Sequence, residues 1–452
     1  MRVEVFRISS SRYTPRKMKS ISAFFLFVVG CSTLFAQTIK VESPNSADVN
    51  AVFADSKALY LDLHQHPELS GHEVETAAKL SAKLRALGYE VTEHIGGNGI
   101  VAILKNGAGP TVMLRTELDA LPVEEKTGLP YASKARTKDD SGKDVPVMQA
   151  CGHDLHMSSF YGTATVMAKT KDTWHGTLML VGQPAEETIS GAPSMIKDGI
   201  FKRFPKPDYG IALHDTNYMP VGQISITPGA MSSNADSLKV TIYGRGGHGS
   251  APHTTIDPIL IAAKTIESLQ SIVSRELRPS EFGVVTVGYI HGGTKNNIIP
   301  DFVEMGLTVR TYNPDVREHI LKAIDRIVKA EAEAAGADKM PTIERYEFTD
   351  AVVNDAALSE KIRAQEKLAL GAENVIQLAP GTGSEDYAFF IEAGVPSVYF
   401  DIGAANQKVF DDAKAAGKNL PSLHSSLFAP EIDPALHTGI AAEVTALRTL
   451  LN

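Results

Sequence analysis

Apolar residues recur at helical spacing in two segments near the N-terminus, residues 47–66 and 72–87, and Gly88 is a stop signal for the second. A further helix is expected from about Asp154 to Ala168. Runs of strand length occur at residues 89–95, 99–104, 111–114, 176–182 and 209–214. Strands that alternate with helices predict an α/β domain with a mixed sheet flanked by helices.

The pattern changes after Pro228. Three alternating apolar runs and two helical segments are expected here, at residues 238–243, 283–290, 302–310, 257–274 and 314–335. They predict a small α+β unit over residues 230–344. Because helix–strand alternation resumes afterwards, we expect this unit to be inserted into a larger domain formed by residues 47–229 and 345–452.

The first 36 residues have the pattern of an export signal. Basic residues precede the apolar stretch 21–29, and Ala36 offers a cleavage site. The stretch is too short to span a bilayer. We therefore expect a signal peptide at residues 1–36 and a periplasmic or secreted protein. The segment Val28-Val29-Gly30-Cys31 leaves a lipid anchor on Cys31 open as an alternative.

Composition narrows the function further. The chain of 452 residues is 43% hydrophobic and 21% charged, which is typical of a soluble globular protein. A net charge of −9 without a long basic cluster gives no indication of nucleic-acid binding. The chain has two cysteines, so Cys151 has no internal disulfide partner once Cys31 is removed or lipidated.

The segment Cys151-Gly152-His153-Asp154-Leu155-His156 places a thiol and an imidazole two residues apart at the expected start of a helix. Thiolate and imidazole are good ligands for zinc and neighbouring metals. Asp154 and His156 are close enough in sequence to support such ligands from outside.

Two adjacent carboxylates, Glu186 and Glu187, directly follow an apolar strand. Alone, such a pair is more often a solvated loop. At the carboxyl end of a strand in an α/β fold, however, a ligand crevice is expected. One carboxylate can then bind metal while its neighbour acts as a general base. His214 closes another strand and His424 lies in a polar loop, and each alone is equally well an ordinary hydrogen-bonded histidine.

The order and context of these motifs resemble the dinuclear metal amidohydrolases of the aminoacylase and hippurate-hydrolase type, including the plant auxin-conjugate hydrolases. The resemblance covers about residues 55–445. The matching segments are HPEL (66–69), DALP (119–122), ACGHD (150–154), QPAEE (183–187), GGHG (246–249), PH (252–253), DP (257–258), NIIPD (297–301), SED (384–386) and His424.

The resemblance implies hydrolysis of the amide bond of a small N-acyl or N-aminoacyl amino acid, with Glu186 as the general base. It implies two divalent metal ions per subunit, zinc or manganese, with cobalt or nickel also possible. Their ligands are then Cys151, His153, Glu187, His214 and His424, with Asp119, Asp154 and His156 around them.

The resemblance further implies that the inserted unit is a ferredoxin-like lid and dimerisation domain, so that the protein is a homodimer. This unit is expected to contribute His248, Asn297 and Arg310 to substrate binding.

At three places the sequence differs from the usual pattern of this family. These differences concern the surroundings of the site and the fine substrate preference. Glu117 stands where the family usually has aspartate, Gln149 where it often has histidine, and Asp215-Thr216-Asn217 follows His214.

Two other classes of protein fit these residues less well. A cysteine hydrolase with Cys151 as nucleophile would leave the paired glutamates and the two later histidines without a function. A non-catalytic metal- or peptide-binding protein would not need Glu186, which is present.

Overall fold

The computed structural model of the chain describes residues 42, 43 and 45–452. The predicted signal peptide and the alternative lipid site at Cys31 lie outside the described residues. Over the described part, no helix combines the length and apolar character that a membrane crossing requires.

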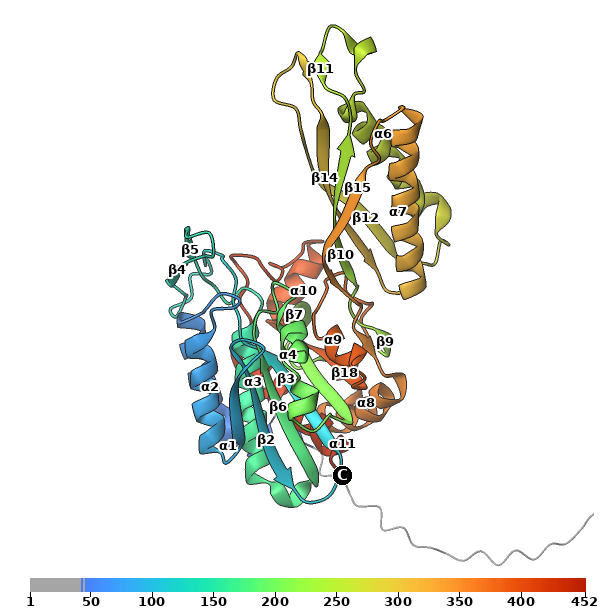
Figure 1. Cartoon of the computed structure of the whole chain (residues 1–452). Coiled ribbons are helices and arrows are strands. Elements are labelled where there is room, and N and C mark those ends of the chain that lie inside the picture. Colours follow the sequence, from blue (N-terminus) through green and yellow to red (C-terminus); the bar gives the residue numbers. More distant parts are fainter. Residues whose placement is uncertain (1–41, 44) are drawn as a thin grey trace, which may run out of the picture. The chain divides into compact units, whose positions relative to one another are not determined.

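A large mixed sheet forms the centre of the main domain (Figure 1). Among the described residues it has eight strands, in the order β1 (Glu90–Ile95), β2 (Gly99–Asn106), β6 (Gly176–Gln183), β3 (Thr111–Glu117), β7 (Tyr209–Pro220), β18 (Ser397–Ala405), β8 (Ile224–Ser225) and β17 (Val375–Ile376). The neighbours β6, β3, β7 and β18 run parallel, whereas β1 and β2 are antiparallel additions at one edge.

Helices cover both faces of this sheet. One face packs on α1 (Ala47–Gln65), α2 (Val74–Ala86), α3 (His153–Lys169), α8 (Ala356–Leu370) and α11 (Ile432–Leu450), and the other on α4 (Gly191–Lys197), α5 (Ile200–Arg203) and α9 (Ala388–Glu392).

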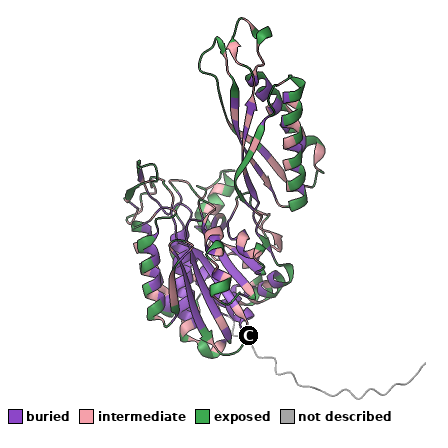
Figure 2. Cartoon of the chain, in the orientation of Figure 1, coloured by how far each residue is buried: buried purple, intermediate pink, exposed green. Residues whose placement is uncertain are grey.

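The sequence of β6 explains this arrangement. Leu178 and Leu180 point to one apolar cluster, while Met179 and Val181 point to the other. A strand buried on both faces is apolar at successive positions, because neighbouring side chains point to opposite sides. Figure 2 shows the sheet as mostly buried.

A second sheet is built entirely from residues 235–349. Its strands in the described chain are β12 (Gly283–Gly292), β14 (Phe302–Thr311), β10 (Ala235–Tyr243) and β15 (Thr342–Thr349), all antiparallel. With α6 (Pro258–Ser271) and α7 (Pro314–Ala334) the chain order is β-α-β-β-α-β, the ferredoxin-like arrangement. The predicted fold class, an α/β domain with a small α+β unit inserted, is confirmed.

The strand β15 was not among the predicted strands, and the predicted boundary at residue 344 falls inside it. Within the described chain it is an edge strand, paired only with β10, and most of its residues are exposed. Such a strand buries few side chains and therefore has little apolar alternation in its sequence. The positions of the domain boundaries otherwise stay predictions.

Several short elements complete the main domain and the inserted unit. They are the ribbons β4 (Arg136–Lys138) with β5 (Asp144–Pro146), β9 (Gly229–Ala230) with β16 (Val353–Asn354), and β11 (Gly247–His248) with β13 (Ile298–Ile299), and the helix α10 (Gln407–Ala415).

Candidate metal centre

The turn that begins α3 brings Cys151 and His153 to the same side of the chain. Gly152 between them has φ 76°, in the left-handed region, and a Cβ there would lie 2.3 Å from Asp215 Oδ1. Glycine is therefore required, both for the backbone conformation and for the close approach to β7. The neighbouring strand β7 carries His214, so α3 and β7 together place three potential ligands side by side.

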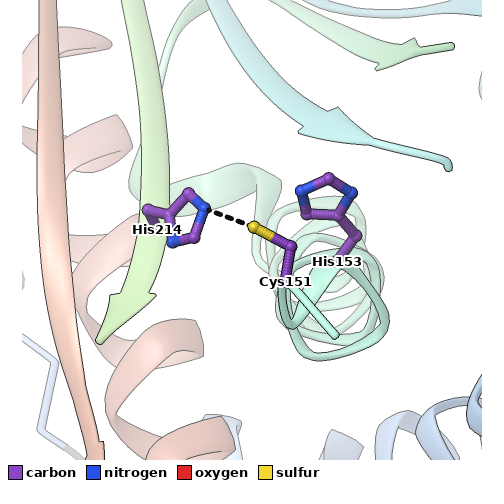
Figure 3. A group of neighbouring side chains, drawn as sticks. All are labelled: Cys151, His153 and His214. Atoms are coloured by element: carbon purple, nitrogen blue, oxygen red, sulfur yellow. Dashed lines mark hydrogen bonds between the residues drawn. The ribbon is translucent and has the colours of Figure 1, made fainter. Parts of the chain in front are cut away.

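The thiol of Cys151 lies between two histidines. Its Sγ is 3.5 Å from His214 Nε2 and 3.3 Å from His424 Nε2. Figure 3 shows the contact with His214 as a dashed line. His424 Nε2 is in turn 3.3 Å from Glu187 Oε2. Cys151, His153 and His214 form one group whose ligand atoms all lie within 4.8 Å of one another. Cys151, Glu187 and His424 form a second such group. The structure thus brings the five sequence-predicted ligands together, with Cys151 common to both groups.

The histidine rings are oriented by backbone carbonyls. His153 Nδ1 is 2.9 Å from Asp119 O, and His214 Nδ1 is 2.8 Å from Asp215 O. A carbonyl only accepts, so each Nδ1 carries the proton and each Nε2 keeps its lone pair for a metal.

Two buried atoms of the cluster have no hydrogen-bond partner among the described residues, His153 Nε2 and Glu187 Oε1. An unpaired buried polar atom costs about 1–3 kcal/mol, so such atoms are rare unless a ligand engages them. The donor set of thiolate, imidazole and carboxylate therefore fits divalent metal ions.

The cluster has a surplus of negative charge. Burial, followed by the charges of Glu187 and Glu186, raises the pKa of the Cys151 thiol well above its ordinary value. Burial lowers the pKa of His153, but its bond to Asp119 and the charge of Glu117 raise it to about 10 overall. Both pKa shifts arise because the cluster lacks positive charge. Cations bound here would supply it.

Glu186 is buried beside the same cluster. It shares a group within 4.8 Å with His153 and Glu187. The backbone around it is fixed, because Ala185 N donates to Glu73 at 2.8 Å and Glu187 N donates to Asp119 Oδ2 at 3.0 Å. Burial, followed by the charge of Glu385, raises the pKa of Glu186 well above its ordinary value. This shift has the same origin as that of Cys151, which is burial together with the surplus of negative charge. The position of the carboxyl group beside the five converging residues suits it for proton transfer.

The three supporting residues have different partners. Asp119 holds His153 and Glu187 N, as described above, and also accepts from Ser70 Oγ at 2.7 Å. His156 lies 3.0 Å from both Glu117 Oε2 and Asp215 Oδ1. Asp154 points away toward α1 and contacts His64 Nδ1 at 2.7 Å. It therefore anchors the start of α3 instead of supporting a ligand directly.

A buried cation behind the cluster was missed by the sequence reasoning. Arg115 in β3 donates to Gln183 Oε1 at 2.9 Å, to Glu385 Oε1 at 2.8 Å and to Glu117. The available signal was an arginine directly after the apolar run Val112–Leu114, because a charged residue in a buried strand requires partners.

The three residues predicted from the inserted unit lie apart from these contacts. His248 Nδ1 accepts from Ser250 N and Oγ within its own loop, at 3.1 and 2.8 Å. Asn297 O accepts from Gly249 N at 2.9 Å, and Arg310 lies in β14 opposite Val284. No hydrogen bond within the described chain joins any of the three to the five converging residues, so their role stays a prediction.

Comparisons with known proteins agree with this geometry. The model of peptidase family M20/M25/M40 matches residues 113–419. An N-acetyl-L-cysteine deacetylase from Bacillus subtilis (strain 168) is 35% identical over 357 residues, which are 78% of this chain and 82% of that protein. A hippurate hydrolase from Campylobacter jejuni is 36% identical over 332 residues, 73% of this chain and 83% of that protein.

Among solved structures, a dinuclear metal-binding peptidase of the M20 family from Bacillus subtilis superposes with a TM-score of 0.72 at 26% identity. The match covers 89% of this chain and all of that one, 100%. The family match extends over more than half of the chain and includes four of the five converging residues, all but His424. The chain therefore belongs to peptidase family M20/M25/M40, and it is a metal-dependent hydrolase of amide bonds.

Proposed function

We propose that this protein hydrolyses the amide bond of small N-acyl or N-aminoacyl amino acids with the help of two divalent metal ions. The observation that carries the proposal is the convergence of two ligand groups on Cys151, with unpaired His153 Nε2 and Glu187 Oε1 beside the buried Glu186. The relatives support this substrate class, because their names refer to N-acetyl-L-cysteine and hippurate.

The metal ligands in this proposal are Cys151, His153, Glu187, His214 and His424. Divalent ions bound there would lower the pKa of a water molecule and polarise the amide carbonyl. Glu186 accepts a proton from the attacking water and returns it to the leaving nitrogen. Cys151 serves as a thiolate shared between the two ligand groups and does not attack the substrate. A thiolate among the ligands favours zinc, while manganese is the second choice.

The inserted unit would complete the site. Arg310 or Asn297 would hold the free carboxylate of the substrate, since an arginine can make a two-point contact with it. His248 would be a second donor to the oxygen of the amide carbonyl. Closure of this unit as a lid would exclude water, and its outer surface would form a homodimer.

The proposed place of action is the periplasm or the outside of the cell. It is supported by the basic-then-apolar pattern of residues 1–36. Sequencing the N-terminus of protein from the native cell tests it. An unprocessed start would contradict export.

The reaction is tested with purified protein stripped of metal by a chelator. A panel of N-acyl amino acids and dipeptides is then offered with zinc, manganese, cobalt or nickel. We expect no turnover after chelation and recovery with at least one metal. A cysteine hydrolase would keep its activity in the chelator, and a binding protein would take up metal yet cleave no member of the panel.

A further inference from the structure

A cavity of about 400 Å³ is lined by two segments that lead directly to residues of the metal cluster. On one side it is lined by Thr216 and Asn217, which follow His214 along β7. On the other side it is lined by Leu423, which immediately precedes His424. Because both histidines converge on the thiol of Cys151, the cavity adjoins the metal cluster where these two ligands enter it.

The remaining wall comes from α10 and the loop that follows it. Phe410 and Ala413 of α10 line the cavity, and α10 packs against β7. Asn217 holds the loop in place, because its Nδ2 donates to Pro421 O at 2.8 Å. Its Oδ1 is a buried atom without a hydrogen-bond partner among the described residues. Asn217 thus links β7 to the loop that forms the opposite wall of the cavity.

The lining combines an apolar body with a positive rim. Phe410, Leu420 and Leu423 supply apolar surface, while Lys414 and Lys418 supply two ammonium groups. No acidic residue lines the cavity. Within the described chain, neither ammonium group forms a hydrogen bond or an ion pair, although the protein carries a net charge of −9. An occupant with an apolar middle and an anionic end fits this lining.

We infer that this cavity is the subsite for the acyl group, and that it favours acyl chains with a terminal carboxylate. The inference rests on the proposed function, in which the inserted unit holds the carboxylate of the amino acid, so the acyl end faces the main domain. A volume of about 400 Å³ lies within the range of ligand pockets, about 300–1,000 Å³. It is far larger than an acetyl group requires.

The first test fills the cavity. Ala413→Trp places a large ring in it, and Ala415→Trp is the matched control on the exposed part of the same helix. The substrates are N-acetyl, N-hexanoyl and N-adipoyl derivatives of one amino acid. We expect Ala413→Trp to lower kcat/KM for both six-carbon acyl groups at least ~10-fold relative to N-acetyl, because single methylenes in a pocket already change it by about that factor. The control should leave kcat/KM for each of the three substrates within about twofold of the wild type.

The second test removes the charge with a double variant, Lys414→Met and Lys418→Met. Both lysines are exposed, so the fold should tolerate the change. Two exposed ion pairs of about 0.2–1 kcal/mol each predict that the preference for N-adipoyl over N-hexanoyl falls about 2- to 30-fold. The same preference in the wild type should weaken as salt is added.

Three outcomes would overturn the inference. Ala413→Trp could lower activity equally for all acyl groups, or change the preference for the amino acid instead. The double variant could keep the full preference for N-adipoyl. These results leave the proposed function intact, since the wild type would still cleave N-acyl amino acids. A wild type that cleaves none of them overturns the proposed function and the inference together.

Discussion

Replacing Arg115 by methionine should strongly destabilise the main domain. The side chain is fully buried in β3 and donates to Gln183, Glu117, Glu385 and Asp386. Methionine has a similar length but no charge, so three carboxylates would be left in the core without this cation. Removing one partner of a buried ion pair costs about 3–5 kcal/mol.

This cost predicts a large shift in thermal stability. The main domain has more than 250 residues, so each kcal/mol lowers its Tm by about 2 °C, and we expect a decrease of about 6–10 °C. The control is Arg136→Met, which breaks an exposed ion pair with Asp144. An exposed pair contributes about 1 kcal/mol at most, so the control should shift by less than about 2 °C. Calorimetry of both variants with saturating metal makes the comparison. An Arg115→Met variant with the same Tm as the control would refute the reasoning.

The loss of thermal stability in Arg115→Met should also depend on pH. Burial raises the pKa of Glu117, but Arg115 and His156 outweigh burial and hold it well below its ordinary value. In the wild type, Glu117 therefore stabilises the fold above the pKa of the unfolded chain, about 4.3, and loses this effect as the pH falls toward the folded value. Without Arg115 the buried carboxylates must take up protons, which is easier in acid. The difference in Tm between wild type and variant should therefore be larger at pH 8 than at pH 5.

Further predictions concern the metal centre itself. Glu186→Gln should lower kcat at least ~10²-fold while metal content stays near that of the wild type, because this residue moves protons. Glu187→Gln should instead lose metal, and metal analysis of the two variants showing the reverse would exchange their roles. Cys151→Ala should lose metal and activity together, whereas Cys151→Asp should recover part of both, since a carboxylate can also be shared by two cations. An acyl adduct on Cys151, seen by mass spectrometry during turnover, would contradict this. Deleting residues 235–349, which contain the whole second sheet, should leave a folded core that binds metal but has almost no activity, measured by metal analysis and turnover.

Most of the converging residues could be found in the sequence, because they lie at the end of a predicted strand or at the start of a predicted helix. Glu187 follows an apolar strand, His214 lies within another, and the pair around Gly152 begins a helix. The carboxyl ends of parallel strands meet at one edge of a sheet, so residues distant in sequence are brought together there. The fold class followed from the same alternation of strands and helices. His424 lies in a loop without such a signal. For His214 and His424, and for the full set of five ligands, the resemblance was needed.

The buried charges and the polar edge strand could not be predicted in the same way. The partners of Arg115 include Gln183 and Glu385, which are far from it in the chain. A pattern of hydrophobic positions identifies which face is buried, but it does not say which polar groups meet inside. The edge strand β15 has the converse property, since it satisfies backbone pairing on one side while its side chains remain in water. Both features depend on tertiary contacts and leave little local periodicity.

Glu117, where the family usually has aspartate, lies between the buried Arg115 and the metal cluster. One carboxylate oxygen accepts from Arg115, and the other lies 3.0 Å from His156 Nδ1. His156 Nε2 is 3.0 Å from Asp215 Oδ1, and the carbonyl of Asp215 fixes the ring of His214. A continuous series of polar contacts therefore runs from the core of the sheet to a residue of the metal cluster. The glutamate thus contacts the buried cation with one carboxylate oxygen and the histidine with the other. Groups outside a metal cluster orient its ligands in this way, so the support of His214 begins at Arg115 in the core of the sheet.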